Sequence, residues 1–140
     1  MSLYIIDCSV AVKWYVPETH SQAAVALLDE SHELHAPELL LAEFGNTLWK
    51  KRRRGELTDA EVRSILQAFW TVPLEIHPLD TLVEGAVELA LQTERTVYDS
   101  LYVALALLLG GPVVTADEGL IAGLQAAGFA GSVRHVAALA

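Results

Sequence analysis

Two short apolar runs in the sequence each end at an aspartate that has a hydroxyl residue two positions away. The first run, LYII, stops at Asp7 and is followed by Ser9, and the second, PVV, leads through Thr115 to Asp117. Short apolar runs bounded in this way are typical of buried strands, so both carboxylates should stand at strand ends. Carboxylates and hydroxyls gathered at one place are the groups that bind a hard cation such as Mg²⁺ or Mn²⁺.

Two further carboxylates lie in strongly apolar surroundings. Glu43 lies in LLLAEFGNTLW, and on a helix it would share a face with Leu40 and Thr47. Asp99 stands near the start of VYDSLYVALALLLG, a helical pattern so apolar that it should be buried on most sides. Taken singly, each of these acids could be an ordinary helix cap or lie at the edge of the surface. Taken together, they form a candidate site if the fold gathers them.

Four converging carboxylates would need a counter-charge, because unpaired buried anions are costly. No basic residue lies within three positions of Asp7, Asp99 or Asp117. The remaining remedies are raised pKa values or a bound cation, and oxygen ligands favour Mg²⁺ or Mn²⁺. Zinc is a poor fit, because the chain has a single cysteine, Cys8, and its histidines lack the spacing of helical or Cys/His zinc motifs.

Composition favours one domain over residues 1–140, with 53% hydrophobic residues to fill a single core. The longest apolar stretch is interrupted at Gly110, so we expect no membrane-spanning segment. We also expect no secretory signal, and a lone cysteine fits a reducing cytoplasm. The formal net charge is -9, which argues against a non-specific nucleic-acid binder.

Short β-like runs alternate with longer helical patterns along the chain. This alternation predicts a parallel sheet with helices on both faces and a ligand site at the carboxyl ends of its strands. We expect Ser9 to cap a short helix, Pro37 to lie in the first turn of the next long helix, TDAE to form a capping box from Thr58, and Gly110 to end the apolar helix. The expected strands cover residues 3–7, 33–36, 74–77, 112–115 and 133–136.

Four segments in order, IIDCSV, PELLLAEFGNTLWK, YDSLYVALA and VVTAD, resemble a PIN domain. The resemblance is closest to the VapC-type toxins of bacterial and archaeal toxin–antitoxin pairs, and it covers nearly the whole chain. It implies a three-layer α/β/α fold around a parallel five-stranded sheet of order 3-2-1-4-5. It also implies a metal site built from Asp7, Glu43, Asp99 and Asp117, with Ser9 and Thr115 in support.

The activity implied by this resemblance is Mg²⁺- or Mn²⁺-dependent endoribonuclease cleavage of RNA by a metal-activated water. The resemblance further implies a cognate antitoxin partner and a homodimer. One basic block is the candidate for contacts with RNA phosphates: Lys50, Lys51, Arg52, Arg53 and Arg54. The alternative for this block is a solvated helix end whose cations complement the helix dipole.

Two other functions are compatible with acids at strand ends. One is a PIN scaffold that binds RNA or protein without cleaving. The other is a receiver-like Mg²⁺-binding module, which would need a late lysine beside its phosphoacceptor aspartate. The lysines of this chain are Lys13, Lys50 and Lys51, so none follows the last expected strands, and this counts against the receiver-like alternative.

Overall fold

A parallel five-stranded sheet forms the centre of the molecule in the computed structural model, which describes residues 2–139. The strands pair in the order β3-β2-β1-β4-β5, and every neighbouring pair is parallel. This order confirms the predicted topology. The strands are β1 (Ser2–Ile6), β2 (His32–Pro37), β3 (Leu74–His77), β4 (Val113–Thr115) and β5 (Val133–His135).

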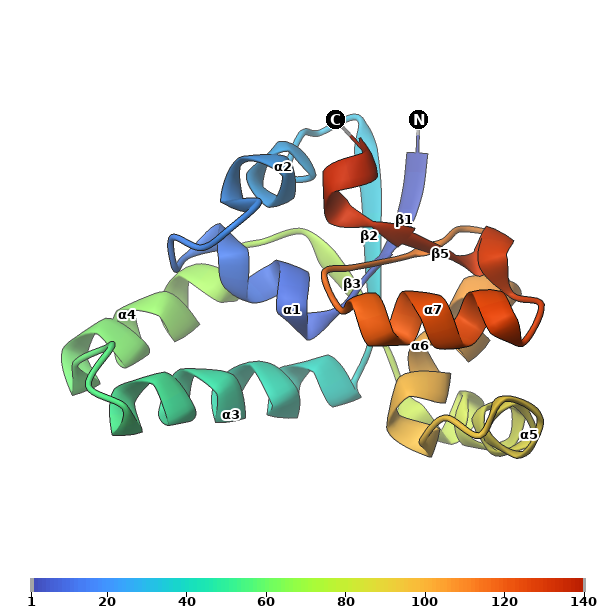
Figure 1. Ribbon diagram of the computed structural model, residues 1–140. Coiled ribbons are helices and arrows are strands. Elements are labelled where there is room, and N and C mark those ends of the chain that lie inside the picture. The colour runs from blue at the N-terminus through green and yellow to red at the C-terminus, as the bar shows by residue number, and fades with distance from the viewer. Residues whose placement is uncertain (1, 140) are drawn as a thin grey trace.

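Helices lie on both sides of the sheet, and the predicted three-layer α/β/α fold is confirmed. Figure 1 shows α1 to α4 on one side, with α3 and α4 as an antiparallel pair, and α5 to α7 on the other. The α-helices are α1 (Cys8–Ala11), α2 (Ser21–Ala26), α3 (Leu39–Arg53), α4 (Asp59–Phe69), α5 (Val83–Thr93), α6 (Val97–Leu109) and α7 (Glu118–Ala126). Short 3₁₀ turns are η1 (Val12–Trp14), η2 (Leu79–Thr81), η3 (Ala130–Ser132) and η4 (Val136–Leu139).

Strands β1 and β4 lie side by side in the middle of the sheet. Ile5, Ile6, Val113 and Val114 are fully buried, as expected for central strands covered on both faces. The Asp7 N–H donates to the Val114 carbonyl at 3.2 Å. The carboxyl ends of the two strands, where Asp7 and Asp117 follow, are therefore held next to each other.

Several helix boundaries follow local sequence signals. The Thr58 hydroxyl accepts the Glu61 N–H while the Glu61 carboxylate accepts the Thr58 N–H, so the predicted capping box begins α4. Gly110, with a φ of 77°, ends α6 as predicted.

Two predicted helix starts are wrong, and four of the five predicted strands differ from the observed ones by one residue at one or both ends. Ser9 does not cap the first helix, because Asp7 does so by accepting the Cys8 N–H at 2.8 Å. Pro37 does not start the long helix. It pairs with His77 as the last residue of β2, and α3 begins at Leu39.

The sheet order removes the receiver-like alternative. Receiver folds have the order 2-1-3-4-5, with the third strand next to the first, whereas β1 here lies between β2 and β4. Among residues 2–139, the helices are all too short or too polar to span a bilayer.

Candidate active site

All four predicted carboxylates line one pocket of about 500 Å³, which we call the acidic pocket. They come from distant parts of the chain: Asp7 follows β1, Glu43 lies on α3, Asp99 lies in the first turn of α6, and Asp117 caps α7. The sheet order explains the meeting, because β1 and β4 are neighbours and both end at this edge. The fold therefore brings the four acids to one pocket as expected, but no three of them have ligand atoms that all lie within 4.8 Å of one another.

The two hydroxyl residues hold the Asp7 carboxylate in place. Thr115 Oγ1 donates to Asp7 Oδ2 at 2.7 Å, and Ser9 Oγ donates to the same oxygen at 2.9 Å. Ser9 Oγ also accepts the Ala116 N–H at 3.0 Å, which joins the end of β1 to the end of β4. The hydroxyls next to each aspartate thus orient a carboxylate and join two strand ends.

The remaining acids are each held by a local partner. Asp117 Oδ1 accepts the Leu120 N–H at 3.1 Å, so one of its oxygens caps α7. The Tyr102 hydroxyl, on α6, donates to Glu43 Oε1 and ties α3 to α6. Arg95 donates to Asp99 Oδ2 at 3.0 Å. These contacts fix the direction of each carboxylate before any ligand binds.

The electrostatics of the pocket favour a cation. Burial raises the pKa of Asp7 above its ordinary value, hydrogen bonds from Thr115 and Ser9 act against this, and the charge of Asp99 adds to the rise. Burial also raises the pKa of Glu43, reinforced by the charges of Asp7 and Asp99 and opposed by the Tyr102 hydrogen bond. Asp7 and Glu43 therefore resist ionising together unless further positive charge enters the pocket.

The donor set fits a hard divalent cation. The pocket offers four carboxylates and contains no histidine among its lining residues. Cys8 also lines it, but burial raises the pKa of the thiol to about 12, so it stays protonated and is a poor metal ligand. Oxygen ligands of this kind suit Mg²⁺ or Mn²⁺.

Basic side chains also line the acidic pocket. The cations that line it are Lys13, Lys50, Lys51 and Arg54. Glu18 binds two of them, accepting from Lys51 Nζ at 2.8 Å and from Lys13 Nζ at 3.4 Å. Burial alone would raise the pKa of Glu18, but Lys51 and Lys13 lower it below its ordinary value. Lys51 is thus committed to an internal ion pair, which leaves Lys50 and Arg54 better placed to meet a ligand.

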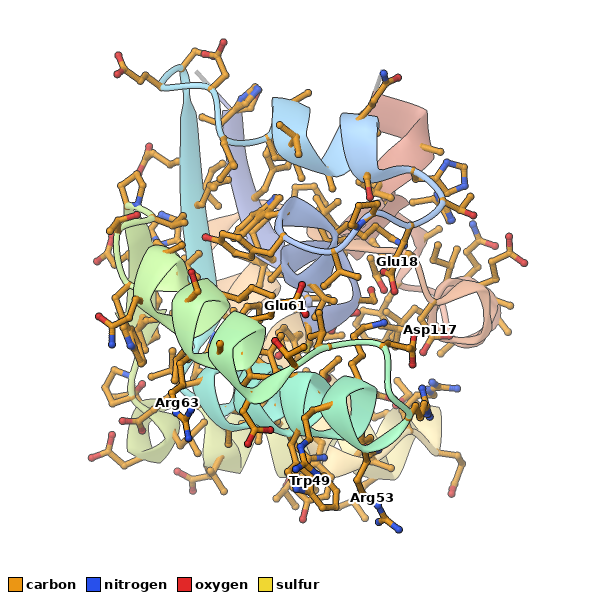
Figure 2. The ribbon with its side chains drawn as sticks, turned by 90° about the vertical axis from the view of Figure 1, so that its left-hand side faces the viewer. Glu18, Trp49, Arg53, Glu61, Arg63 and Asp117 are labelled. Carbon is orange, nitrogen blue, oxygen red and sulfur yellow. The ribbon has the colours of Figure 1, made fainter. Side chains whose placement is uncertain are left out.

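The other two members of the basic block, Arg52 and Arg53, do not line the acidic pocket. Arg52 donates to Asp59 at 2.6 Å, and the Arg53 guanidinium lies 5.2 Å from the centre of the Trp49 ring. In Figure 2, Trp49 and Arg53 project from α3 away from Asp117 and Glu18. The structure thus divides the block between the pocket and the outer face of α3.

Sequence reasoning missed two residues that orient the acids. Tyr102 and Arg95 lie three positions after and four positions before Asp99, and both spacings bring side chains together at a helix. The helical spacing around Asp99 could have identified both. Arg95 precedes α6 and also packs near Gly123 of α7, where an added Cβ would lie 3.2 Å from its Cδ.

Comparison with known proteins agrees with this fold. The PIN domain model matches residues 4–123. The protein named Ribonuclease VapC3 from Pyrobaculum aerophilum is 37% identical over 118 residues, which are 83% of this chain and 90% of that protein. The chain therefore belongs to the PIN domain family.

Two solved structures share the fold. The crystal structure of PAE2754 from Pyrobaculum aerophilum matches with a TM-score of 0.67 and 25% identity, covering 99% of this chain and 86% of that one. The crystal structure of VapBC2 from Rickettsia felis, bound to a DNA fragment from their promoter, matches with a TM-score of 0.70 and 16% identity, covering 95% and 98%.

Proposed function

We propose that this protein is a Mg²⁺- or Mn²⁺-dependent endoribonuclease and the toxin of a toxin–antitoxin pair. One observation carries the proposal: four carboxylates from separate elements line one pocket that basic side chains also line. The name of the relative from Pyrobaculum aerophilum, Ribonuclease VapC3, supports RNA as the substrate. Acidic and basic side chains in the same pocket suit a phosphodiester, since the carboxylates can hold a cation and the basic side chains can hold phosphates.

Each residue has a defined part in this proposal. When bound, the divalent cation supplies an activated water and stabilises negative charge on the phosphoryl oxygens. Asp7, Asp99 and Asp117 would hold it, and Glu43 would bind it or orient the attacking water. Ser9 and Thr115 keep Asp7 aligned through the hydrogen bonds described above. Attack by water needs no 2′-hydroxyl of the RNA, so we expect product ends that carry a 5′-phosphate.

The direct test compares RNA cleavage by the wild type, Asp99→Asn and Asp80→Asn. Asp80 is exposed on η2, outside the acidic pocket, so the second substitution is a matched control. We expect Asp99→Asn to keep its circular dichroism spectrum and to lose cleavage by at least about 10²-fold, the size of effect expected for a group that stabilises the transition state. EDTA should abolish wild-type cleavage.

Full activity in Asp99→Asn, or in the presence of EDTA, would rule out this mechanism. A folded wild type that binds Mn²⁺ yet cleaves neither tRNA, rRNA nor mRNA would favour the alternative of a catalytically silent PIN scaffold. Mapping the cleaved ends after induction in cells identifies the RNA target.

The proposal includes two protein partners for a single-domain cytoplasmic protein. Exposed apolar side chains on α5 and α6 support a homodimer, and they are Val83, Val87, Leu91, Leu107 and Leu108. The acidic pocket supports an antitoxin segment that inserts an arginine among the carboxylates. Light scattering should give twice the chain mass for the isolated toxin, and the antitoxin should inhibit cleavage. A monomer, or a complex that cleaves at the free rate, would contradict these two expectations.

A further inference from the structure

A second group of metal-binding side chains lies on β2 and β3, outside the acidic pocket. His35, Glu75 and His77 each offer one ligand atom, and these three atoms lie within 4.8 Å of one another. None of the three residues lines the acidic pocket. We propose that they form a binding site for a borderline divalent transition metal ion of the Zn²⁺ class, separate from the carboxylate centre.

Strand register brings these residues together. In the parallel pair β2–β3, His35 is opposite Glu75 and Pro37 is opposite His77. Side chains alternate between the two faces of a strand, so Glu75 and His77 share the face on which His35 lies. The order of the sheet places β3 at its edge, where an ion can reach the site from solvent.

The distances match a tetrahedral ion. Zinc bonds of about 2.0–2.1 Å to nitrogen place two tetrahedral ligand atoms roughly 3.4 Å apart. His35 Nδ1 lies 3.4 Å from Glu75 Oε2 and 2.9 Å from His77 Nε2. Only a small opening between the two imidazoles is needed, and the Glu75 side chain is 68% exposed and free to adjust.

His35 is already oriented as a ligand. Its side chain is only 6% exposed, and its second ring nitrogen, Nε2, lies 3.4 Å from Glu33 Oε1. A carboxylate that accepts the N–H of one ring nitrogen leaves the lone pair of the other nitrogen for a metal, and metal-binding histidines usually have such a partner. Glu33 therefore favours the His35 tautomer that carries its proton on Nε2, which leaves the lone pair of Nδ1 directed towards Glu75 and His77.

The ligand set fits a borderline divalent cation. Glu33 and Glu75 each place a carboxylate oxygen 3.4 Å from a ring nitrogen of His35, so two carboxylates share one imidazole. Two imidazoles and one carboxylate are a known zinc ligand set that leaves a fourth position for water. Because imidazole suits zinc whereas carboxylates suit Mg²⁺ and Mn²⁺, the two sites should select different ions. Bound metal would join the edge strand β3 to β2.

The test measures Zn²⁺ binding in an Asp7→Asn/Asp99→Asn background, which weakens the acidic pocket. Tag-free protein is titrated with Zn²⁺ against a chromophoric chelator, and Co²⁺ absorption reports the coordination geometry. His77→Asn and Glu75→Gln remove ligands within this background. His20→Asn is the matched control, because His20 is exposed and remote in sequence, and asparagine tolerates its φ of 68°.

We expect the background protein to bind one Zn²⁺ and to give a tetrahedral Co²⁺ spectrum. Loss of a ligand should weaken Zn²⁺ binding at least tenfold, since losing even an outer partner of a metal ligand costs about 10–100-fold. His20→Asn should bind as the background does. Two results would overturn the proposal: no Zn²⁺ binding in the background protein, or Zn²⁺ affinities in Glu75→Gln and His77→Asn that equal the affinity of the background protein. Either result would leave His35 and His77 as a hydrogen-bonded pair. If His77→Asn fails to fold, Zn²⁺ binding by Glu75→Gln decides between the two outcomes, because Glu75 is exposed and its substitution should not disturb folding.

Discussion

Asp7 illustrates how a side chain that is unfavourable to bury can serve a proposed function. It caps α1, accepts two hydroxyl hydrogen bonds and lies in the same pocket as three other carboxylates. Its raised pKa means that the folded, metal-free protein holds a proton at pH values where the unfolded chain has released it. Functional sites often retain such unfavourable groups, so their removal can stabilise the fold while abolishing activity.

We therefore predict that Asp7→Asn stabilises the metal-free protein. Because the pKa is raised in the folded state, stability falls as pH rises from the ordinary value of 3.8 through the folded value. Above that window the variant should melt higher by about 2–5 °C, which corresponds to roughly 1 kcal/mol in a domain of this size. Scanning calorimetry of both proteins with EDTA, from acid to neutral pH, measures this gap, the melting temperature of Asp7→Asn minus that of the wild type.

The gap should grow as pH rises and vanish in acid, where Asp7 is protonated in both states. A gap that shrinks towards neutral pH, or a variant that melts lower at pH 7, would contradict this account. Asp80→Asn, at an exposed position, should leave the melting temperature unchanged at every pH.

At the scale of elements, the sequence identifies those whose signals are local. The strand at residues 74–77 has its predicted bounds, and the capping box of α4 and the glycine that ends α6 are where local rules place them. The error at Pro37 arises because a tertiary partner decides, since pairing with β3 keeps Pro37 in a strand. The error at Ser9 is local, because Asp7, two residues earlier, accepts the Cys8 N–H and caps α1.

The carboxylate pocket could be predicted because its members are conspicuous in apolar segments. The group formed by His35, Glu75 and His77 could not, since it depends on the register between strands about 40 residues apart in sequence. Single residues give no indication of that register. The usual histidine spacings of zinc sites describe ligands on one helix or in Cys/His motifs, and they do not describe ligands paired across a parallel sheet.

Close contact between β1 and the start of β4 underlies the pocket, and Gly111 permits it. A Cβ at this position would lie 2.5 Å from the Leu3 carbonyl oxygen, so we predict that Gly111→Ala costs about 1–3 kcal/mol, as overpacking generally does. Gly45→Ala is the control: it lies within α3 with no atom within 4 Å of an added Cβ, and should stabilise by up to about 1 kcal/mol.

Urea unfolding of the two glycine variants measures both values. Equal stability of Gly111→Ala and the wild type would show that β1 and β4 can separate at no cost. Close packing of β1 against the start of β4 would then not explain how Asp7 is held beside Asp117.

At the scale of the whole molecule, charge is divided unevenly. The chain carries a formal net charge of -9, yet Lys50 and Arg54 line the same pocket as Asp7 and Asp117. An acidic surface repels RNA in general, so productive binding should depend on these few cations. Repulsion elsewhere and attraction at the pocket would direct the RNA to the carboxylates.

We predict that Arg54→Glu weakens RNA binding and lowers the slope of log affinity against log salt by about 1. Binding is measured by fluorescence anisotropy in the Asp99→Asn background, so that the RNA stays intact. Arg63→Glu is the matched control, because Arg63 is exposed on α4 and does not line the acidic pocket; Figure 2 shows it far from Asp117. Equal losses in both variants would indicate a general charge effect.

Four carboxylates that are distant in sequence are proposed to bind a divalent cation, Mg²⁺ or Mn²⁺, jointly. Electron paramagnetic resonance of free Mn²⁺ during titration tests this joint binding most directly, with Mg²⁺ as competitor. We predict that the wild type and Asp80→Asn bind Mn²⁺ equally, whereas Asp7→Asn and Asp117→Asn each lose at least about tenfold in affinity. Equal Mn²⁺ affinity in all four proteins, each shown to be folded, would contradict the account.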